Sequence, residues 1–296
     1  MSIGEKIKRL REKKRMTQSE LAGDHVSRNM LSLIENGRAT PSVQTLEALA
    51  EKLKTTSAFL LADRGEETAL LKHSSIKDIR IAFSGKNYHI AANLCQRLYE
   101  DGMGADDEVD LVLAESLLET AKESLLADRV REACALFDQA VYYAERTAYY
   151  ADHILGAAWL YFEYMGLLSP SLVSETLEAE TASAYATAAR RDDAFCRYIQ
   201  SYLGESSDEM ITFSADPAYT RLLAAHIRAE KSMREGDFEK ALGELTEILR
   251  GEDVLPGIVM YHVFADLEEG CRRVGNDRNA GLYQDLKVSQ FEKLMS

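Results

Sequence analysis

Hydrophobic positions recur at spacings of three and four residues along almost the whole chain, which is the pattern of amphipathic α-helices. Between residues 3 and 61 the pattern comes in short pieces, and the pairs Ser2/Glu5 and Thr17/Glu20 have the spacing of capping boxes that begin helices. Longer amphipathic segments follow from residue 74 onward. The four prolines and 17 glycines are too few for a sandwich or barrel of many short strands. We therefore predict an all-α fold that begins with five short helices.

One of the short helices, over residues 27–36, has two unlike faces. At about 100° per residue, the arc that we expect to pack carries Ser27, Met30, Leu31 and Ile34. The opposite arc carries Arg28, Asn29, Ser32, Leu33 and Asn36. A guanidinium can bind guanine, an amide can bind adenine, and an aliphatic tip can contact the methyl group of thymine. This face therefore has the side chains that are needed to read base edges in DNA.

Polar side chains at neighbouring helix ends complete the predicted DNA surface. Phosphates are bound by amide, hydroxyl and guanidinium groups and by helix N-termini, and such contacts fix the register of a protein on the duplex. The residues in suitable positions are Thr17, Gln18, Asn36 and Arg38. We expect most of the basic run from Lys6 to Arg15 to be a solvated helix face.

These motifs resemble the lambda-repressor/Cro-type (XRE-like) helix-turn-helix domain. The resemblance covers about residues 3–61, and it rests on the segments Thr17-Gln18-Ser19-Glu20-Leu21-Ala22, Val26-Ser27, Leu31-Ser32-x-Ile34-Glu35-Asn36-Gly37, Pro41-Ser42 and Leu46 to Leu53. It implies that residues 27–35 are the recognition helix, that Gln18 is the family's helix-2 glutamine, and that the bases are contacted by Arg28, Asn29, Ser32 and Leu33. The turn at residues 23–25 is one residue shorter than the usual pattern, which bears on the angle between the two helices.

The charge of the chain is divided unevenly. Residues 1–64 hold 12 Lys and Arg against 8 Asp and Glu, whereas the rest of the chain holds 23 against 41. A basic head suits a polyanion, and an acidic body repels one. We therefore predict a helix-turn-helix DNA-binding domain at residues 1–64, a linker at residues 65–73 and a second domain at residues 74–296.

A loose repeat runs through the second domain. Its clearest copies are Val130-x-x-Ala133-x-x-x-Phe137 and Gly236-Asp237-Phe238-x-x-Ala241-Leu242, and weaker copies are anchored at Tyr88 and Asp277. These segments resemble tetratricopeptide (TPR) hairpins, in which small residues let two helices approach each other. The resemblance implies a TPR-like α-solenoid with degenerate repeats in residues 148–235. The concave face of such a solenoid is lined by the first helix of each pair and binds extended peptides.

A candidate peptide groove follows from the repeat. Positions counted back from the predicted loops, together with nearby aromatic and histidine side chains, are Lys122, Tyr161, Tyr164, His226, Glu230, Glu269 and Arg272. A lambda-repressor-type head on a TPR-like body resembles the peptide-pheromone regulators of the Rap/Rgg/NprR/PlcR/PrgX grouping. That resemblance implies a cytoplasmic quorum-sensing transcription regulator, a homodimer that binds double-stranded operator DNA and a small peptide in its groove.

Other functions stay open on the sequence. The body could be a docking module for a larger protein, or it could only dimerise, which would make the chain a constitutive repressor with no effector. A Rap-type action on response regulators is a third idea, for which we can assign no catalytic residue.

Candidate catalytic and membrane features are few. The sequence has no Gly-rich phosphate loop, no H-E-x-x-H and no G-x-S-x-G, so we expect no enzyme activity, no cofactor and no metal site. The charged N-terminus does not have the pattern of a secretory signal, and no run of about 18 apolar residues predicts a membrane span. Widely spaced cysteines suit reduced thiols in the cytoplasm: Cys95, Cys134, Cys196 and Cys271.

Overall fold

The computed structural model describes residues 2–23, 25–61, 64–102, 106–173, 194–204, 217–250 and 255–296. The regular secondary structure of these residues is helical. The predicted all-α fold is confirmed. The chain divides into two compact units, Met1–Asp78 and Ile79–Ser296. Within the described ranges, no helix is both long enough and apolar enough to cross a membrane.

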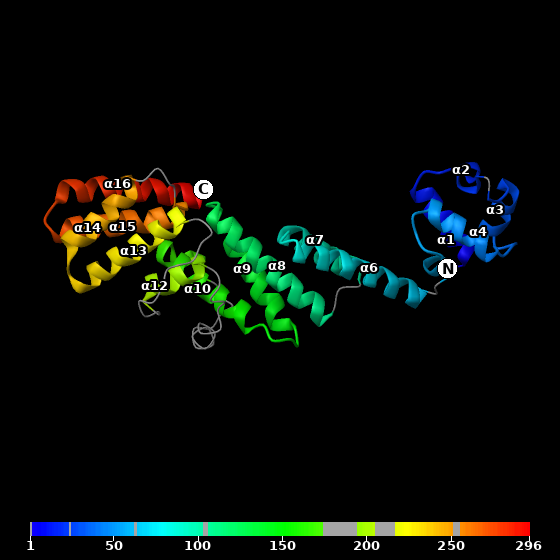
Figure 1. The fold of residues 1–296 in the computed structure, drawn as a ribbon, viewed down its shortest axis with the longest axis horizontal. Coiled ribbons are helices and arrows are strands. Elements are labelled where there is room, and N and C mark those ends of the chain that lie inside the picture. The colour runs from blue at the N-terminus through cyan, green and yellow to red at the C-terminus, as the bar shows by residue number, and fades with distance from the viewer. Residues whose placement is uncertain are drawn as a thin grey trace. The chain divides into compact units, whose positions relative to one another are not determined.

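The first unit contains the five short helices that the sequence predicts (Figure 1), namely α1 (Ile3–Lys13), α2 (Gln18–Ala22), α3 (Arg28–Glu35), α4 (Val43–Lys52) and α5 (Ser57–Leu61). Every one of them contributes to a single small core. The most deeply buried side chain of each helix is at most 1% exposed, in the order Ile7, Leu21, Leu31, Leu49 and Leu60.

The two predicted capping boxes are present and fix where α1 and α2 begin. The Ser2 hydroxyl accepts a hydrogen bond from the Glu5 amide at 3.3 Å, and the Ser2 amide donates to the Glu5 carboxylate at 2.8 Å. Thr17 and Glu20 make the same reciprocal pair at 3.2 and 2.6 Å. These bonds satisfy backbone donors that would otherwise have no partner in the first turn.

A glycine lets α1 approach α3 closely. A Cβ atom at Gly4 would lie 2.0 Å from the carbonyl oxygen of Ile34, which is far inside van der Waals contact. The backbone of α1 therefore packs directly on the last turn of α3. This contact positions α3 within the first unit.

The segment predicted as a linker is helical. Residues 65–73 lie within α6 (Arg64–Ser84), and the division between the two compact units also falls within this helix, after Asp78. The predicted domain boundary lies nearer the N-terminal end of α6 than the observed division does.

The second unit is a series of longer helices, several of which form antiparallel hairpins (Figure 1). The hairpins with the most extensive contact are α8/α9, α15/α16 and α13/α14. After α6, the helices are α7 (Tyr88–Glu100), α8 (Asp107–Leu126), α9 (Val130–Arg146), α10 (Asp152–Leu168), the 3₁₀-helix η1 (Pro170–Leu172), α12 (Ala194–Leu203), α13 (Pro217–Glu235), α14 (Phe238–Arg250), α15 (Gly257–Arg273) and α16 (Asp277–Met295).

The repeat anchors read from the sequence are confirmed as helix starts. Tyr88, Val130, Phe238 and Asp277 are the first residues of α7, α9, α14 and α16. Two positions before each anchor, the backbone adopts a positive φ of between 57° and 84°, at Lys86, Asp128, Gly236 and Gly275. Three positions after each anchor lies a buried alanine: Ala91, Ala133, Ala241 and Ala280. Parts of the predicted degenerate repeats, at residues 174–193 and 205–216, lie outside the described residues.

One hydrogen bond joins repeats that are far apart in the sequence. The Asp128 carboxylate, in the turn between α8 and α9, accepts from the backbone amide of Gly257 at 2.6 Å. Gly257 is the first residue of α15, and a Cβ there would lie 2.5 Å from the second carboxylate oxygen of Asp128. Helix α8 also contacts α15, and α9 contacts α16. The second unit therefore packs its early hairpin directly against its last one.

The four cysteines are free thiols in the second unit. Burial raises the pKa of Cys95 to about 12 and that of Cys134 to about 11. Thiols with such high pKa values stay protonated at neutral pH and are poor nucleophiles.

Candidate nucleic-acid interface

The predicted recognition helix, α3, presents most of its predicted DNA-reading side chains to solvent. Arg28, Asn29 and Leu33 are exposed, and Ser32 is half-buried. On the opposite side, Leu31 and Ile34 are buried in the core of the first unit. The outward face of α3 therefore carries a guanidinium, an amide, a hydroxyl and an aliphatic tip, which we call the reading face.

The packed side of α3 differs from the prediction at three positions. Ser27 and Met30, which we expected to pack, are exposed, Met30 to 44%, whereas Glu35 is only 4% exposed. At about 100° per residue, the packed arc is centred near Leu31 and extends toward Glu35 instead of Met30. The reason is chemical, because a partner from α1 lets the Glu35 carboxylate enter the interior.

That partner is Arg11. Its guanidinium donates to both carboxylate oxygens of Glu35, from Nε at 2.7 Å and from a terminal nitrogen at 3.1 Å, and also to the Met16 carbonyl at 2.9 Å. The side chains of Arg11 and Glu35 are 11% and 1% exposed. Burial alone would raise the pKa of Glu35, but the hydrogen bonds from Arg11 and Gln18 outweigh it and hold that pKa below its ordinary value.

Gln18 completes this network from α2. Its side-chain amide donates to the Glu35 carboxylate at 2.8 Å. Glu35 thus joins α1, α2 and α3 at one point, which fixes the start of α2 against the end of α3. We define Arg11, Gln18 and Glu35 as the head network.

The remaining predicted phosphate contacts lie around the reading face. Thr17 is exposed, and its hydroxyl takes part in the cap of α2. Asn36 is exposed and donates from its side chain to the Ser32 carbonyl at 2.8 Å. Arg38 is exposed. Contacts from these residues and from Gln18 to DNA stay predictions, as do the base contacts of the reading face.

Two members of the basic run of α1 have structural roles that we did not expect. Lys6 is 3% exposed, donates to the Phe59 carbonyl at 3.2 Å and lies over the Phe59 ring at 5.6 Å. Arg11 belongs to the head network. The signal in the sequence was their position, since Lys6 and Arg11 flank the apolar stripe of α1 at helical spacing.

The predicted groove residues fall into two groups, and the first group is buried. Tyr161, Tyr164 and His226 are fully buried, and Lys122 is 7% exposed. Tyr161 stacks on Phe137 with ring centroids 4.9 Å apart. These side chains do not line an open face as we expected, because the inward-pointing aromatic rings of several helices pack against one another.

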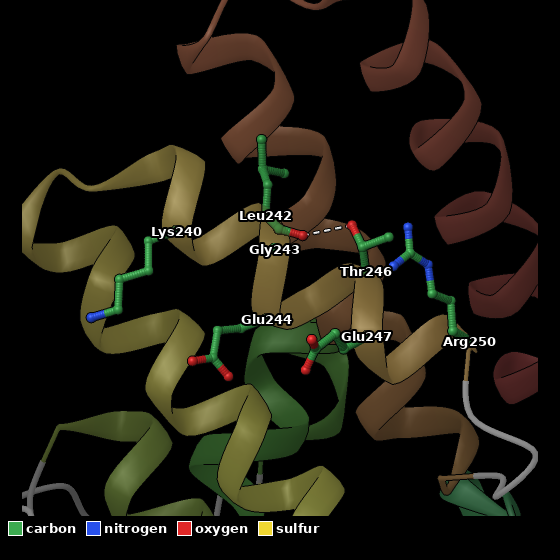
Figure 2. A pocket seen from close by; sticks show the side chains of 7 residues that line it. All are labelled: Lys240, Leu242, Gly243, Glu244, Thr246, Glu247 and Arg250. Atoms are coloured by element: carbon green, nitrogen blue, oxygen red, sulfur yellow. Dashed lines mark hydrogen bonds between the residues drawn. The ribbon is translucent and has the colours of Figure 1, made fainter.

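The second group is nearer to solvent and is paired with neighbouring charges. Glu230 is partly buried and pairs with Arg234 at 2.9 Å. Glu269 pairs with Arg273 and Arg272 pairs with Glu268, each at 2.6 Å. None of the seven predicted groove residues lines the surface hollow of about 490 Å³ on α14 (Figure 2), which is formed by Lys240, Leu242, Gly243, Glu244, Thr246, Glu247 and Arg250.

Two comparisons found similar proteins over part of the chain. Residues 7–60 match the protein family described as Helix-turn-helix. The immunity repressor protein of Bacillus phage phi105 is 38% identical over 71 residues, which are 24% of this chain and 47% of that repressor. The match therefore spans about half the length of the phage protein.

Solved structures with similarity over nearly the whole chain have low sequence identity. Bacillus thuringiensis PlcR in complex with the peptide PapR7 and DNA is 12% identical, with 99% of this chain and 98% of that chain covered and a TM-score of 0.23. ComR from S. thermophilus, in complex with DNA and its signalling peptide ComS, is 16% identical, with 100% and 95% covered and a TM-score of 0.24. The Streptococcus dysgalactiae pheromone receptor Rgg2 is 14% identical, with 99% and 98% covered and a TM-score of 0.20.

These identities and TM-scores assign no residue role in this chain. The family match, in contrast, confirms the prediction for the first unit. Residues 7–60 form a helix-turn-helix domain of the predicted type, and they include α3, whose role as the recognition helix stays a prediction.

Proposed function

We propose that this protein is a sequence-specific DNA-binding transcription regulator. The observation that carries the proposal is the reading face of α3, which is solvent-exposed and held in place by the core of a helix-turn-helix domain. Arg28 suits guanine, Asn29 suits adenine and Leu33 suits the thymine methyl group. The exposed basic and polar groups around this face suit the phosphate backbone on either side.

We further propose that the second unit makes the protein a homodimer and controls it. Two recognition helices bind best to half-sites about one DNA turn apart, so a change in the shape of a dimeric body alters operator affinity. The combination of a lambda-repressor-type head and TPR-like hairpins supports a short peptide as the effector. Action on DNA in the cytoplasm follows from this proposal.

The direct test begins with selection of an operator from random duplex DNA by the full-length protein. At the selected site, R28A and N29A are each expected to cost about 1–3 kcal/mol of binding free energy and to relax sequence selectivity at one position. R97A is the charge-matched control, because Arg97 is an exposed residue of α7 outside the head. Affinity should also fall steeply with salt concentration, since phosphate contacts release counterions.

Two results would contradict the DNA-reading proposal. One is full affinity and selectivity in both R28A and N29A. The other is binding that does not change between low and high salt, because a head that holds phosphates cannot be insensitive to counterions.

A further inference from the structure

The interior of the second unit contains a chain of hydrogen-bonded polar side chains from four helices. The hydroxyls of Tyr164 (α10) and Tyr198 (α12) lie 3.2 Å apart, and the Tyr198 hydroxyl is 2.8 Å from Nδ1 of His226 (α13). Nε2 of His226 is 2.8 Å from the carboxylate of Asp266 (α15). The Tyr202 hydroxyl donates to the same carboxylate at 3.5 Å. We call these five residues the polar chain.

Two carboxylates lie where this chain approaches solvent. Asp266 ends the polar chain and its side chain is 13% exposed, while Glu230, one turn after His226 on α13, is 19% exposed. Burial, followed by repulsion from Asp266, raises the pKa of Glu230. Arg234 pairs with Glu230 at 2.9 Å, whereas the partners of Asp266 within the described part of the chain are an imidazole and a phenol.

A second histidine lies beside the same group, and one of its ring nitrogens has no hydrogen-bond partner among the described residues. His262, one turn before Asp266 on α15, is 3% exposed, and its Nε2 has no partner among the described residues. Its ring centroid lies 4.6 Å from that of Tyr164 and 5.2 Å from that of Tyr202. Burial, and then the proximity of His226, lower the pKa of His262 to about 3, so its imidazole is neutral at physiological pH.

These groups share one chemical property, because they accept hydrogen bonds or attract cations. Carboxylates and a neutral imidazole nitrogen accept hydrogen bonds, and tyrosine ring faces attract cations. An unpaired polar atom in the interior is costly, and the Nε2 of His262 can accept a hydrogen bond from an outside donor when the imidazole proton is on Nδ1. Beyond residue 64 the chain has 41 Asp and Glu against 23 Lys and Arg, and this negative charge also favours a positively charged ligand.

We propose that Glu230, Asp266 and His262, beside the ring of Tyr202, form a recognition site for an ammonium or guanidinium group of the effector. This proposal rests on the effector control proposed above and adds the chemistry of the ligand. A metal ion is a poorer occupant, since no group of three His, Cys, Asp or Glu side chains in the described part of the chain converges as metal ligands do.

The test measures binding to the full-length protein by titration calorimetry, with no DNA present. The probes are agmatine, a capped pentapeptide of one arginine among four alanines, and the same peptide with glutamine in place of arginine. We expect the first two to bind and the glutamine peptide to bind at least tenfold more weakly. If the arginine peptide binds more tightly than agmatine, the effector is a peptide that carries the cationic group. If agmatine binds more tightly, the effector is a small free amine.

Variants locate the site. E230Q and D266N keep the size of each side chain and its ability to accept hydrogen bonds, but remove the charge, and each should weaken the binding of agmatine at least tenfold. E247Q is the matched control, because Glu247 lies in the separate hollow on α14 (Figure 2). E230Q is the decisive variant if D266N unfolds, because Glu230 is the more exposed carboxylate, and tyrosine circular dichroism checks that each variant is folded.

Several outcomes would overturn the cation site. They are no binding of agmatine or the arginine peptide at 10 mM, equal binding of the glutamine peptide, unchanged binding in E230Q, or equal loss in E247Q. The operator-binding test described above is independent of them. A protein that binds its operator through α3 but binds no cation would remove this site and leave the DNA-binding proposal intact.

Discussion

The two units of this protein bury polar groups in different ways. In the first unit, the carboxylate of Glu35 meets a guanidinium from Arg11 and an amide from Gln18, so charge is balanced within the fold. In the second unit, the polar chain ends at Asp266, whose partners are neutral or weakly basic groups, and the Nε2 of His262 has no partner among the described residues.

The two units therefore have different tasks in our proposal: the first supports an exposed surface, and the second binds a ligand. A balanced ion pair needs nothing from outside, so the first unit can hold the reading face of α3 in place at all times. In our proposal, the cluster in the second unit gains free energy when an outside donor pairs with it. We therefore interpret the first unit as a support for an exposed surface, and we propose that the interior of the second unit binds a ligand.

Breaking the ion pair of the head should have the largest effect. R11M removes the guanidinium and leaves Glu35 charged in the interior, which we expect to destabilise the first unit by about 3–5 kcal/mol. Hydrogen exchange of the α1 and α3 amides in the full-length chain measures this loss. R9M is the control, because Arg9 is exposed on the same helix. Equal exchange rates in R11M and wild type would show that the head does not depend on its balanced charge.

Acidification should reproduce part of that loss. The pKa of Glu35 is held below its ordinary value of 4.5, so its contribution to stability is complete above that value and is lost as the pH falls through the lowered pKa. The loss should be smaller than in R11M, since protonated Glu35 can still accept a hydrogen bond from Arg11. Hydrogen exchange as a function of pH tests this, and in R11M the midpoint should move to higher pH.

In the second unit, removing one hydroxyl should have an intermediate effect. Y198F leaves Nδ1 of His226 and the hydroxyl of Tyr164 without their shared partner, which we expect to cost about 1–3 kcal/mol. Tyrosine fluorescence during urea unfolding follows this unit selectively, because all 14 tyrosines lie beyond residue 64. Y150F is the control at a side chain that is 70% exposed. Equal stability of the two variants would mean that the polar chain is not needed for the fold.

The smallest effects on the stability of the second unit should come from substituting two glycines of one hairpin, and the two effects should have opposite signs. Gly236 has a φ of 84°, so G236A is expected to destabilise the body by about 1–2 kcal/mol. Gly243 lies inside α14 with nothing within 4 Å of an added Cβ, so G243A is expected to stabilise it by about 0.5–1 kcal/mol. The same tyrosine signal measures both, and equal signs would contradict the assigned turn.

The sequence was most informative where a signal was local. The caps at Ser2 and Thr17 and the starts of the repeat helices depend on residues a few positions apart, and all of them were predictable. The reading face of α3 was predictable for the same reason, because a short helix in a small bundle has a single packed side.

Long-range pairing was less predictable. The burial of Glu35 depends on Arg11, 24 positions earlier, and its position on α3 gives only a hint of that partner. The tyrosines assigned to an open groove are interior because each helix of the second unit has neighbours on more than one side. Counting along one helix identifies an inward direction, but it does not tell whether solvent or another aromatic ring is found there.

The bond between Asp128 and Gly257 has a consequence for how the second unit folds. In most repeat proteins, each module is supported only by its immediate neighbours, so damage at one end remains local. Here the cap of α15 comes from a turn 129 positions earlier in the chain. The array should therefore melt as a single cooperative block, and trimming it from its C-terminal end should weaken its early modules as well.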